Sequence, residues 1–455
     1  MQLSTSTDIP KIKGIPEIPG ARSIVGHLLK PGDDHASVCE DCFKTSIFQI
    51  RLGNTRAVVV NSFEDCRRML IGHQFAVIDR PKLYTFHGVI SSTQGFTIGS
   101  PPWDGSCRNK RKAAGQTLGR VAIKTYYPMF DLETCCIVGD LIRDSNGGTV
   151  FLSIRPYLQR YALNTTLTLC YGIRMDSLRA RRDKYLNDLL YRVREMIEKG
   201  DDKPCVSAAI LKVEETKLSG VEVSLICFCI GSLSTPEGQK FQQRAYEDIL
   251  RHHPTVEDAW SKCLEVEGIP YINAIVKEAE RYYTVSSMSL PREAYTDIQW
   301  NGATIPKATM ILINAQAANH EPENYGPDAG TFNPERWLST TSPPEEIPAI
   351  GIQHFSFGAG SCACSGQYIA SRLLYTALVR LICSFQFVAS ENEPPNTDYM
   401  DYNQFKSALV ATPRDFKVKL ISQGPEKNLR MCQSCGEKDR GFIHLVTHVS
   451  SPASE

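Results

Sequence analysis

The chain lacks several features that would place it in common classes of protein. None of its apolar runs approaches the roughly 18 to 20 residues that a membrane-spanning helix needs. Residues 1–8 have neither the basic start nor the apolar middle of a signal peptide. An excess of positive charge is also missing, because the formal net charge is +0, and this excludes a global basic field for binding nucleic acid.

No linker or repeat divides the 455 residues. The length would allow two or three ordinary domains, but without a stretch rich in Pro, Gly and Ser one large domain is the better prediction. We assign this domain to residues 9–423, after a short N-terminal stub, residues 1–8, that carries no membrane anchor. Residues 424–455 are polar and are predicted to form a disordered tail.

The cysteines indicate a reducing environment. They are spread at irregular spacing, which is unlike the disulfide framework of a small secreted protein and favours an intracellular location. Two C-x-x-C pairs, Cys39/Cys42 and Cys432/Cys435, leave a zinc site open as an alternative. The pairs lie at opposite ends of the chain, whereas a compact zinc finger keeps its ligand pairs close together. Ordinary thiols are therefore the preferred interpretation.

Glycine and cysteine are concentrated in residues 357–366, Phe-Gly-Ala-Gly-Ser-Cys-Ala-Cys-Ser-Gly. The three glycines of this segment would allow a loop to lie flat against a large planar ring. The following residues, 367–381, repeat apolar side chains at helical spacing and predict a buried helix. Cys364 is therefore expected just ahead of a helix N-terminus, where a thiolate is favoured. This is the arrangement that presents a cysteine to a haem iron.

Two other interpretations of this loop remain open. Residues 358–363 fit the dinucleotide-binding pattern G-x-G-x-x-G/A, but no strong strand precedes them and no acidic residue follows about 20 positions later. A glycine-rich turn with structural cysteines is the simpler alternative for the loop taken alone.

Two further motifs precede the loop. Glu278 and Arg281 fall on one face of a helix predicted over residues 272–282, and such a pair is most often a solvated surface pair. Residues 332–337, Phe-Asn-Pro-Glu-Arg-Trp, supply a second arginine, Arg336. Chance would rarely produce these two motifs and the cysteine loop in this order.

Together, these motifs resemble those of the cytochrome P-450 monooxygenases. Phe357, Gly360, Cys364 and Gly366 match the family's haem-binding signature, whose basic residue is replaced here by Cys362. The resemblance implies a mainly α fold with a small β portion, built as a large helical haem domain with minor β-sheets. It also implies haem b with Cys364 as the ligand of the iron, and a structural cluster of Glu278, Arg281 and Arg336 behind the haem.

The resemblance suggests further contacts with the haem. An arginine placed like Arg292 often meets a haem propionate in the family, and the alternative is a surface arginine at the start of a strand. The segment that begins at Trp103 resembles the family's helix that lies beside the haem edge. The family's arginine position in that helix holds Cys107, and Arg108 follows it. The basic run that begins at Arg108 is either a solvated helix face or a docking surface for an acidic reductase.

Within the family, the resemblance is closest to fungal phenylacetate hydroxylases and runs from about Ile9 to about Ile421. It is carried by residues 78–86, 91–99 and 161–172. The implied reaction inserts one atom of dioxygen into a small aromatic substrate, a phenylacetate-like aryl acid or an aromatic secondary metabolite, with electrons from NADPH through NADPH-cytochrome P-450 reductase. The resemblance makes Phe86, Phe96 and Ile98 candidates for the wall of the substrate pocket, with plain core as the alternative.

The family also bears on location. Fungal members are usually anchored in the membrane of the endoplasmic reticulum by an N-terminal helix. This sequence has no such helix, so a cytoplasmic or peripherally attached protein is expected.

The middle of the chain departs from the family. A long helix carrying an acid/threonine pair, which delivers protons to bound dioxygen, is expected there. Residues 221–233 contain no such pair and predict a shortened distal helix of only roughly 20 Å. The next helix is predicted to have Ser234 as its cap, Thr235 at its first position and Glu237 in a capping box.

We infer from this departure that a block of residues is missing between about Cys229 and Gly231. Ser232, Ser234 and Thr235 are the nearest hydroxyls, and we do not assign them the missing role. Because a positioned proton donor contributes orders of magnitude to rate, the alternative function is a haem-binding pseudoenzyme or truncated gene product with impaired oxygen activation.

Overall fold

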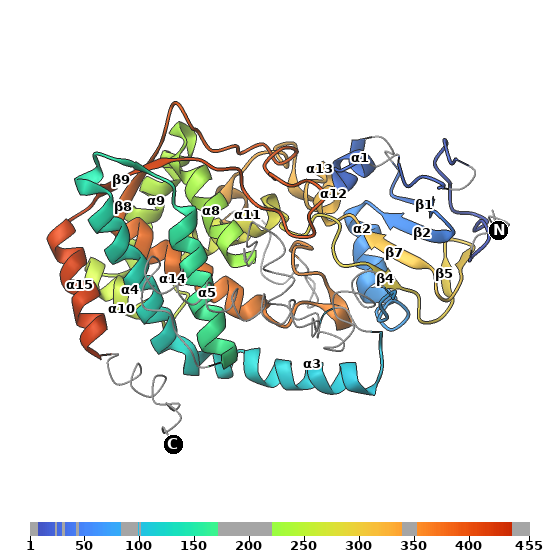
Figure 1. Ribbon diagram of the computed structural model, residues 1–455, viewed down its shortest axis with the longest axis horizontal. Helices are drawn as coiled ribbons and strands as arrows, with labels where there is room; N and C mark the ends of the chain where they lie inside the picture. The colour runs from blue at the N-terminus through green and yellow to red at the C-terminus, as the bar shows by residue number, and fades with distance from the viewer. Residues whose placement is uncertain are drawn as a thin grey trace, which may run out of the picture.

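Helices are the main secondary structure of the described residues, and the largest sheet lies at one end of the molecule. Figure 1 shows most of the long helices on one side, the largest sheet with several short helices on the other, and α3 (Gly105–Leu118) along the lower edge between them. The computed structural model describes residues 8–22, 25–29, 32–41, 45–82, 99, 102–171, 221–338 and 353–438. The predicted mainly α fold with a small β portion is confirmed. The suggested pocket residues Phe86, Phe96 and Ile98 lie outside the described residues.

The helices of the described residues follow one another along the chain. They are α1 (His35–Asp41), α2 (Phe63–Arg67), α3, α4 (Tyr127–Asp144), α5 (Arg155–Tyr171), α8 (Val221–Ser234), α9 (Pro236–His252), α10 (Val256–Lys262), α11 (Pro270–Tyr282), α12 (Ala315–Asn319), α13 (Pro322–Tyr325), α14 (Gln367–Ser384) and α15 (Pro425–Lys438). Short turns of 3₁₀ or π type are η1 (Arg68–Gly72), η3 (Ala122–Tyr126), η4 (Asn146–Gly148), η5 (Pro334–Trp337) and η6 (Gly360–Cys362). None of the helices in these described ranges is long and apolar enough to cross a membrane.

The central helix of the helical part is α14, which begins where the sequence predicted and extends to Ser384. Every residue from Leu373 to Ser384 is buried, as expected of a helix surrounded by other helices. Its neighbours include α4, α8 and α11. The buried Arg380 is neutralised by Asp131 of α4, with Nη2 and Oδ1 2.5 Å apart. This helix therefore fixes the position of the cysteine loop that precedes it.

Three small sheets occur in the described part of the chain. The strands are β1 (Ile47–Leu52), β2 (Thr55–Val60), β3 (Phe151–Leu152), β4 (Arg292–Glu293), β5 (Ile298–Trp300), β6 (Ala303–Ile305), β7 (Met310–Ile313), β8 (Phe385–Ala389) and β9 (Val418–Ser422). The largest sheet has the order β1-β2-β7-β4, the second β3-β9-β8, and the third is the β5-β6 hairpin. In the β1-β2 hairpin, Gly53 has φ +64°, as the first position of a type II′ turn requires.

The C-terminal segment differs from the prediction. Pro425–Lys438 form α15, which packs against α4, so the prediction of a disordered tail is wrong for these residues. Asn428, Met431 and Cys432 lie on one face of the helix; Asn428 is fully buried and the other two pack against the helical core. Because most residues of the segment are polar, the sequence pattern did not reveal this narrow buried face of the helix. Residues 439–455 lie outside the described residues.

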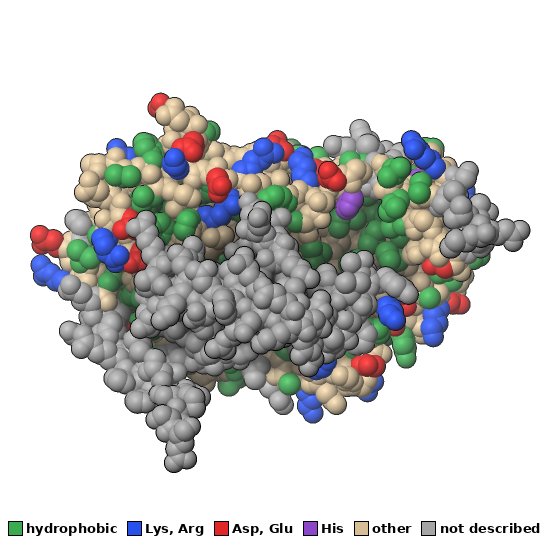
Figure 2. All heavy atoms as spheres, in the orientation of Figure 1, with side chains coloured by type: hydrophobic (Ala, Val, Ile, Leu, Met, Phe, Trp, Pro, Cys, Tyr) green, Lys and Arg blue, Asp and Glu red, His purple; other side chains and the backbone are tan. Residues whose placement is uncertain are grey.

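Charges of both signs occur on the described part of the surface. Figure 2 shows Lys and Arg side chains interspersed with Asp and Glu side chains along the upper edge of the molecule. This agrees with the formal net charge of +0. Mixed charge of this kind produces no large field of one sign.

The C-x-x-C pairs have ordinary surroundings where they are described. Cys39 is buried in a cluster with Phe48, and Cys432 lies on α15 against the helical core. Within the described residues, no three His, Cys, Asp or Glu side chains are placed to hold a metal ion. Cys42 and the side chain of Cys435 are outside the described part of the chain.

Candidate functional site

The loop that carries Cys364 is closed by its own backbone. The N–H of Cys364 donates to the carbonyl of Phe357 at 2.9 Å, and the N–H of Gly358 donates to the carbonyl of Phe355 at 2.8 Å. A third bond joins the N–H of Ala363 to the carbonyl of Gly360 at 3.0 Å. Phe357 is buried, whereas Cys364 is exposed. These hydrogen bonds therefore fix the backbone of the loop in a shape that leaves the side chain of Cys364 exposed.

Gly360 is required by the packing of this loop. Its φ is +63°, and a Cβ atom at this position would lie 2.1 Å from the carbonyl oxygen of Leu70 in η1. Gly358 also has a positive φ, of +67°. Gly366 has φ −87°, so its conformation alone does not call for glycine. The conformations of Gly358 and Gly360 thus confirm the prediction that this loop needs glycine.

The helix that follows the loop supplies an electrostatic field that acts on Cys364. Gly366 is the N-cap of α14, and its carbonyl accepts from the N–H of Ala370 at 3.0 Å. Cys364 lies just before this N-terminus, where the unpaired N–H groups and the helix dipole favour negative charge. The segment before Gly358 is irregular rather than a strand, so the dinucleotide-binding interpretation is wrong.

Helix α3 contacts the loop although it lies far from it in the sequence. Its N-cap is Asp104, whose carboxylate accepts from the N–H of Cys107 at 2.6 Å. The cap directs Cys107 inward, where it is buried, and leaves Arg108 exposed. The guanidinium carbon of Arg108 lies 5.7 Å from the ring centre of the half-buried Trp103. The role of these two residues in holding a haem stays a prediction.

A residue that the sequence argument missed connects α3 to the loop. Arg111 donates from Nη1 to the carbonyl of Ser361 at 3.1 Å. Its Nε is buried and has no hydrogen-bond partner among the described residues. Arg111 follows Cys107 by one helical turn, so it lies on the same face of α3 as that buried residue. This spacing was the signal that could have identified it.

Two arginines come together where β4 begins. Arg292 is buried and donates from Nη1 toward the carbonyl of Val77 at 3.5 Å. Arg80 donates to the carbonyls of Leu290 and Pro291 at 2.6 and 2.8 Å and so fixes the turn that leads into Arg292. The alternative of a surface arginine is therefore wrong for Arg292, and its contact with a propionate stays a prediction.

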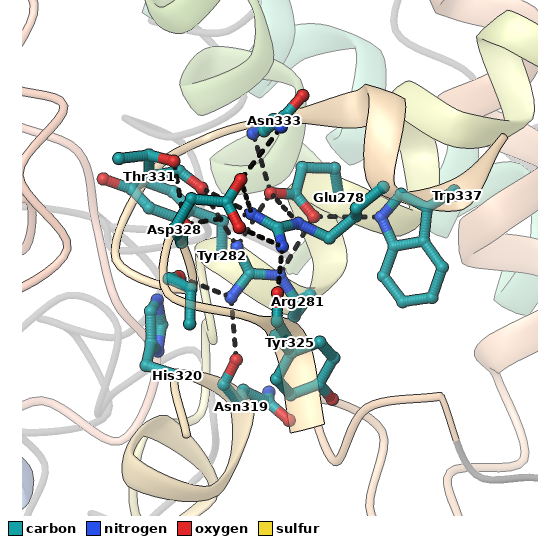
Figure 3. A network of polar contacts seen from close by, with 12 residues as sticks. Glu278, Arg281, Tyr282, Asn319, His320, Tyr325, Asp328, Thr331, Asn333 and Trp337 are labelled. Carbon is teal, nitrogen blue, oxygen red and sulfur yellow. Dashed lines mark hydrogen bonds and ion pairs between the residues drawn. The ribbon is translucent and has the colours of Figure 1, made fainter. Parts of the chain in front are cut away.

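Glu278 and Arg281 of α11 form the centre of a buried polar network (Figure 3). Arg281 Nη2 lies 2.7 Å from Glu278 Oε1, and neither side chain is exposed. Arg281 Nη1 also donates to the carbonyls of Asn319 and Ala329 at 2.8 and 2.9 Å. The interpretation as a solvated surface pair is wrong, because the tertiary fold covers this face of the helix.

Arg336 of η5 joins the same network. Its Nε lies 3.1 Å from Glu278 Oε1, and its Nη2 lies 3.1 Å from Asp328 Oδ2. Trp337 donates from Nε1 to Glu278 Oε2 at 2.9 Å. One buried carboxylate therefore receives hydrogen bonds from two arginines and an indole, as Figure 3 shows. The predicted contact of Arg336 with the Glu278/Arg281 pair is present.

Asn319 links this network to the segment that leads into the cysteine loop. Its carbonyl accepts from Arg281, as described above, and its side-chain Oδ1 accepts from the N–H of Phe355 at 2.8 Å. Its Nδ2 donates to the hydroxyls of Thr284 and Ser356 at 2.8 and 3.1 Å. Through Asn319, hydrogen bonds thus connect the Glu278/Arg281 motif to the segment that leads into the cysteine loop, although the two lie far apart in the sequence.

Helix α8 lies within the helical core. Every residue from Val223 to Ser234 is buried, and the helix packs against α5, α9, α11 and α14. The predicted short helix is confirmed and ends one residue later than expected. No acid/threonine pair occurs in its sequence.

The join between α8 and α9 differs in detail from the prediction. The N-cap of α9 is Thr235, whose hydroxyl accepts from the N–H of Gly238 at 3.0 Å, and Pro236 occupies the first helical position. The predicted cap, Ser234, instead donates to the carbonyl of Gly231 at 2.8 Å. The helix thus starts one residue later than predicted, which removes Glu237 from the capping-box position.

The hydroxyls near this join all serve structural hydrogen bonds. Thr235 Oγ1 also donates to the carbonyl of Ser232 at 2.8 Å, and the Ser232 hydroxyl is hydrogen-bonded to the buried hydroxyl of Tyr283. Burial raises the pKa of Tyr283 well above its ordinary value. These contacts support leaving the three hydroxyls without a catalytic role.

The sequence pattern of the family Cytochrome P-450 matches residues 16–219 and 233–420. The chain belongs to the cytochrome P-450 family. It is thereby an oxidoreductase of the monooxygenase type, and the family implies a haem held by a cysteine thiolate and a redox partner. The interpretation as a nucleotide-binding or zinc protein is not needed.

Several fungal cytochromes P-450 are similar to this chain over most of its length. Phenylacetate 2-hydroxylase of Emericella nidulans is 39% identical over 485 aligned positions, which cover 92% of this chain and 92% of that protein. 3-Hydroxyphenylacetate 6-hydroxylase of the same organism is 29% identical, with coverage of 92% and 90%. Cytochrome P-450 monooxygenase CYP3 of Mycosarcoma maydis is 30% identical, with coverage of 88% and 86%.

The family match is interrupted where α8 lies. Residues 220–232 fall between the two matched ranges and include the position at which the sequence suggested a missing block. The alignment to the first relative spans 485 positions, more than the 455 residues of the chain, so it contains positions without a counterpart here. The length of this alignment supports a loss of residues relative to that protein, and the position of the loss stays a prediction.

Proposed function

We propose that the protein is a haem-thiolate monooxygenase that inserts one atom of dioxygen into a phenylacetate-like aryl acid or a related small aromatic compound. The observation that carries the monooxygenase assignment is Cys364, exposed before α14 in a loop closed by Phe357 and seated on η1 through Gly360. Similarity to two phenylacetate-type hydroxylases supports the substrate class. This similarity, over nine-tenths of the chain, favours an enzyme over a pseudoenzyme.

The residues of the loop fit the group that the family implies. An exposed sulfur beside a helix N-terminus suits an anionic metal ligand, and glycines without side chains suit a planar ring. We assign Cys364 as the ligand of the iron of haem b. When bound, this group supplies the activation of dioxygen, and electron donation from the thiolate favours cleavage of the O–O bond.

The remaining assignments concern binding and orientation. Phe357, Gly360 and Gly366 would line the thiolate side of the ring. The buried Arg292 would offer positive charge to a propionate. Trp103 and Arg108 would lie at the ring edge, and Arg111, which already contacts Ser361, joins this set of basic residues.

Electrons are proposed to come from NADPH through NADPH-cytochrome P-450 reductase. The exposed basic residues at the start of α3, Arg108 and its neighbours, would attract an acidic reductase by complementary charge. Residues 9–423 would act as one haem-thiolate monooxygenase domain. Glu278, Arg281 and Arg336 would stabilise the part of this domain that carries the loop.

The test combines spectroscopy with product analysis. The full chain, loaded with haem and reduced, should give the thiolate-type carbon monoxide band, and Cys364→Ser should abolish it, while the neighbouring Cys362→Ser should retain it. With a reductase, NADPH, phenylacetate and ¹⁸O₂, the protein should form a ring-hydroxylated product that contains one labelled oxygen atom. Absence of bound haem would overturn the monooxygenase assignment. A thiolate band with no hydroxylation of any aryl acid tested would overturn the substrate class alone.

A further inference from the structure

Glu280 is a buried carboxylate that the assignments above do not use. It lies on α11 directly before Arg281, with only 4% of its surface exposed. Its contacts are separate from those of the Glu278/Arg281 pair. A buried carboxylate is costly unless it is hydrogen-bonded, so its partners are informative.

Among the residues that the structure describes, the Glu280 carboxylate has two side-chain partners. Oε2 lies 3.1 Å from Nε2 of His354, and Oε1 accepts from the hydroxyl of Ser371 at 2.7 Å. The backbone carbonyl of Glu280 also accepts a hydrogen bond from the hydroxyl of Ser356. All of these partners belong to the chain around the cysteine loop.

These partners flank Cys364 on both sides. His354 and Ser356 precede the loop, and the ring of His354 lies 6.3 Å from that of Phe357, the residue that closes the loop. Ser371 follows the loop, in the first turns of α14. One residue of α11 therefore holds the entry and the exit of the loop at the same place.

The surroundings of Glu280 offer few alternative hydrogen-bond partners to the side chains that it contacts. His354 is buried, and its Nδ1 has no hydrogen-bond partner in the described residues, so Glu280 is the polar partner that the structure shows for this ring. Loss of the carboxylate would leave buried polar groups on both sides of the loop without their acceptor. Such groups are expensive to leave unpaired, and the loop would shift to satisfy them.

We propose that Glu280 is a positioning residue for the haem ligand: by holding His354 and Ser371 together, it fixes where the loop presents the sulfur of Cys364. The inference rests on the proposed haem-thiolate function. It goes beyond that function because it assigns control of the position of the sulfur to a side chain outside the cysteine loop.

The test uses Glu280→Gln, which keeps the size of the side chain and removes its charge. In the reduced, haem-loaded protein, carbon monoxide reports two states, the thiolate-type band and the band of a displaced or protonated ligand. Hydrogen bonds to a charged group contribute about 1.5 to 3 kcal/mol, so the ratio of the first band to the second should fall roughly tenfold or more. The reduction midpoint potential of the haem should shift with it.

The matched control is Glu133→Gln on α4. Glu133 is also buried, at 1% exposure, and accepts from Asn164 Nδ2 at 3.2 Å, and this contact does not involve the loop. A purely structural role for Glu280 would lower the melting temperature of both variants and leave the band ratio unchanged. Equal band ratios in the two variants would therefore overturn the proposal.

A second variant keeps the test decisive if Glu280→Gln does not fold. Ser371→Ala removes one contact with the carboxylate and leaves His354 in place, so it should lower the band ratio in the same direction by a smaller factor. An unchanged ratio in Ser371→Ala would contradict the proposal. Failure of the wild-type protein to bind haem would instead overturn the proposed function, which keeps the two results distinguishable.

Discussion

Glu278 and Arg281 lie one helical turn apart with 2.7 Å between Oε1 and Nη2, and both side chains are completely shielded from solvent. Removing two charges from water is costly, and the cost is offset here by several further hydrogen bonds. Glu278 also accepts from Asn333, Arg336 and Trp337, and Arg281 also donates to three backbone carbonyls. The pair is therefore stable only while its whole surroundings are intact.

The first prediction concerns this pair. Glu278→Gln should lower the free energy of unfolding by about 3 to 5 kcal/mol, because it leaves the buried guanidinium of Arg281 without its counter-charge. Urea denaturation followed by circular dichroism measures the change. The control is Glu237→Gln, which removes an exposed i,i+3 pair with Lys240 and should cost less than about 1 kcal/mol. Similar losses of unfolding free energy in the two variants would contradict the prediction, because the buried pair would then contribute no more to stability than an exposed pair.

A second prediction separates strain from steric clash in the cysteine loop. Gly360 and Gly302 both have positive φ, but a Cβ on Gly302 would meet no atom within 4 Å, whereas one on Gly360 would meet the Leu70 carbonyl at 2.1 Å. Gly302→Ala should cost about 1 to 2 kcal/mol, which is the strain of the left-handed conformation. Gly360→Ala should cost about 3 kcal/mol or more and weaken haem retention, measured by thermal unfolding and haem absorbance. Equal costs would mean that the loop moves freely away from η1.

The third prediction concerns the tight join between α8 and α9. A Cβ on Gly238 would lie 1.8 Å from the carbonyl oxygen of Ser232, so Gly238→Ala should destabilise the protein by several kcal/mol or displace α9. Gly115 lies inside α3, and a Cβ there would meet no atom within 4 Å. Gly115→Ala should therefore stabilise by about 0.5 to 1 kcal/mol. Chemical denaturation of both variants tests the opposite signs, and stabilisation by Gly238→Ala would contradict the close approach of the two helices.

The fourth prediction is a dependence of stability on pH. Burial, with the charge of Arg281 adding to it, lowers the pKa of His320 to about 3 from an ordinary value of 6.5. His320 stacks on Tyr399 with ring centres 3.9 Å apart, and its Nδ1 lies 2.8 Å from the carbonyl of Gln316. Between these pKa values the unfolded chain binds a proton that the folded chain does not. The contribution of His320 is therefore complete above pH 6.5 and is lost progressively as the pH falls.

The measurement compares wild type with His320→Gln. From about pH 7.5 to about pH 5.5, the wild type should lose about 1.4 kcal/mol more of its free energy of unfolding than the variant does. Denaturation curves at the two pH values give both losses. Identical losses would show that His320 becomes protonated without unfolding, and hence that its ring is accessible to water.

Much of the site could be predicted because its signals are local. The glycines around Cys364 and the apolar spacing of residues 367–381 predict a loop followed by a buried helix, and α14 begins at Gln367 as expected. The surroundings of Arg111 and Glu280 could not be predicted in this way. Each depends on segments far apart in the chain, Ser361 for Arg111 and both His354 and Ser371 for Glu280.

Alone, the sequence determined the family, the order of its motifs, the position of Cys364 before a helix and the shortness of the helix at residues 221–233, because all of these are properties of residues close together in the chain. Only the tertiary structure decided that Glu278 and Arg281 are buried, that polar residues 425–438 fold against α4, and that one carboxylate holds both ends of the cysteine loop. Burial and hydrogen-bond partners depend on which distant elements cover a residue, and local spacing does not encode that.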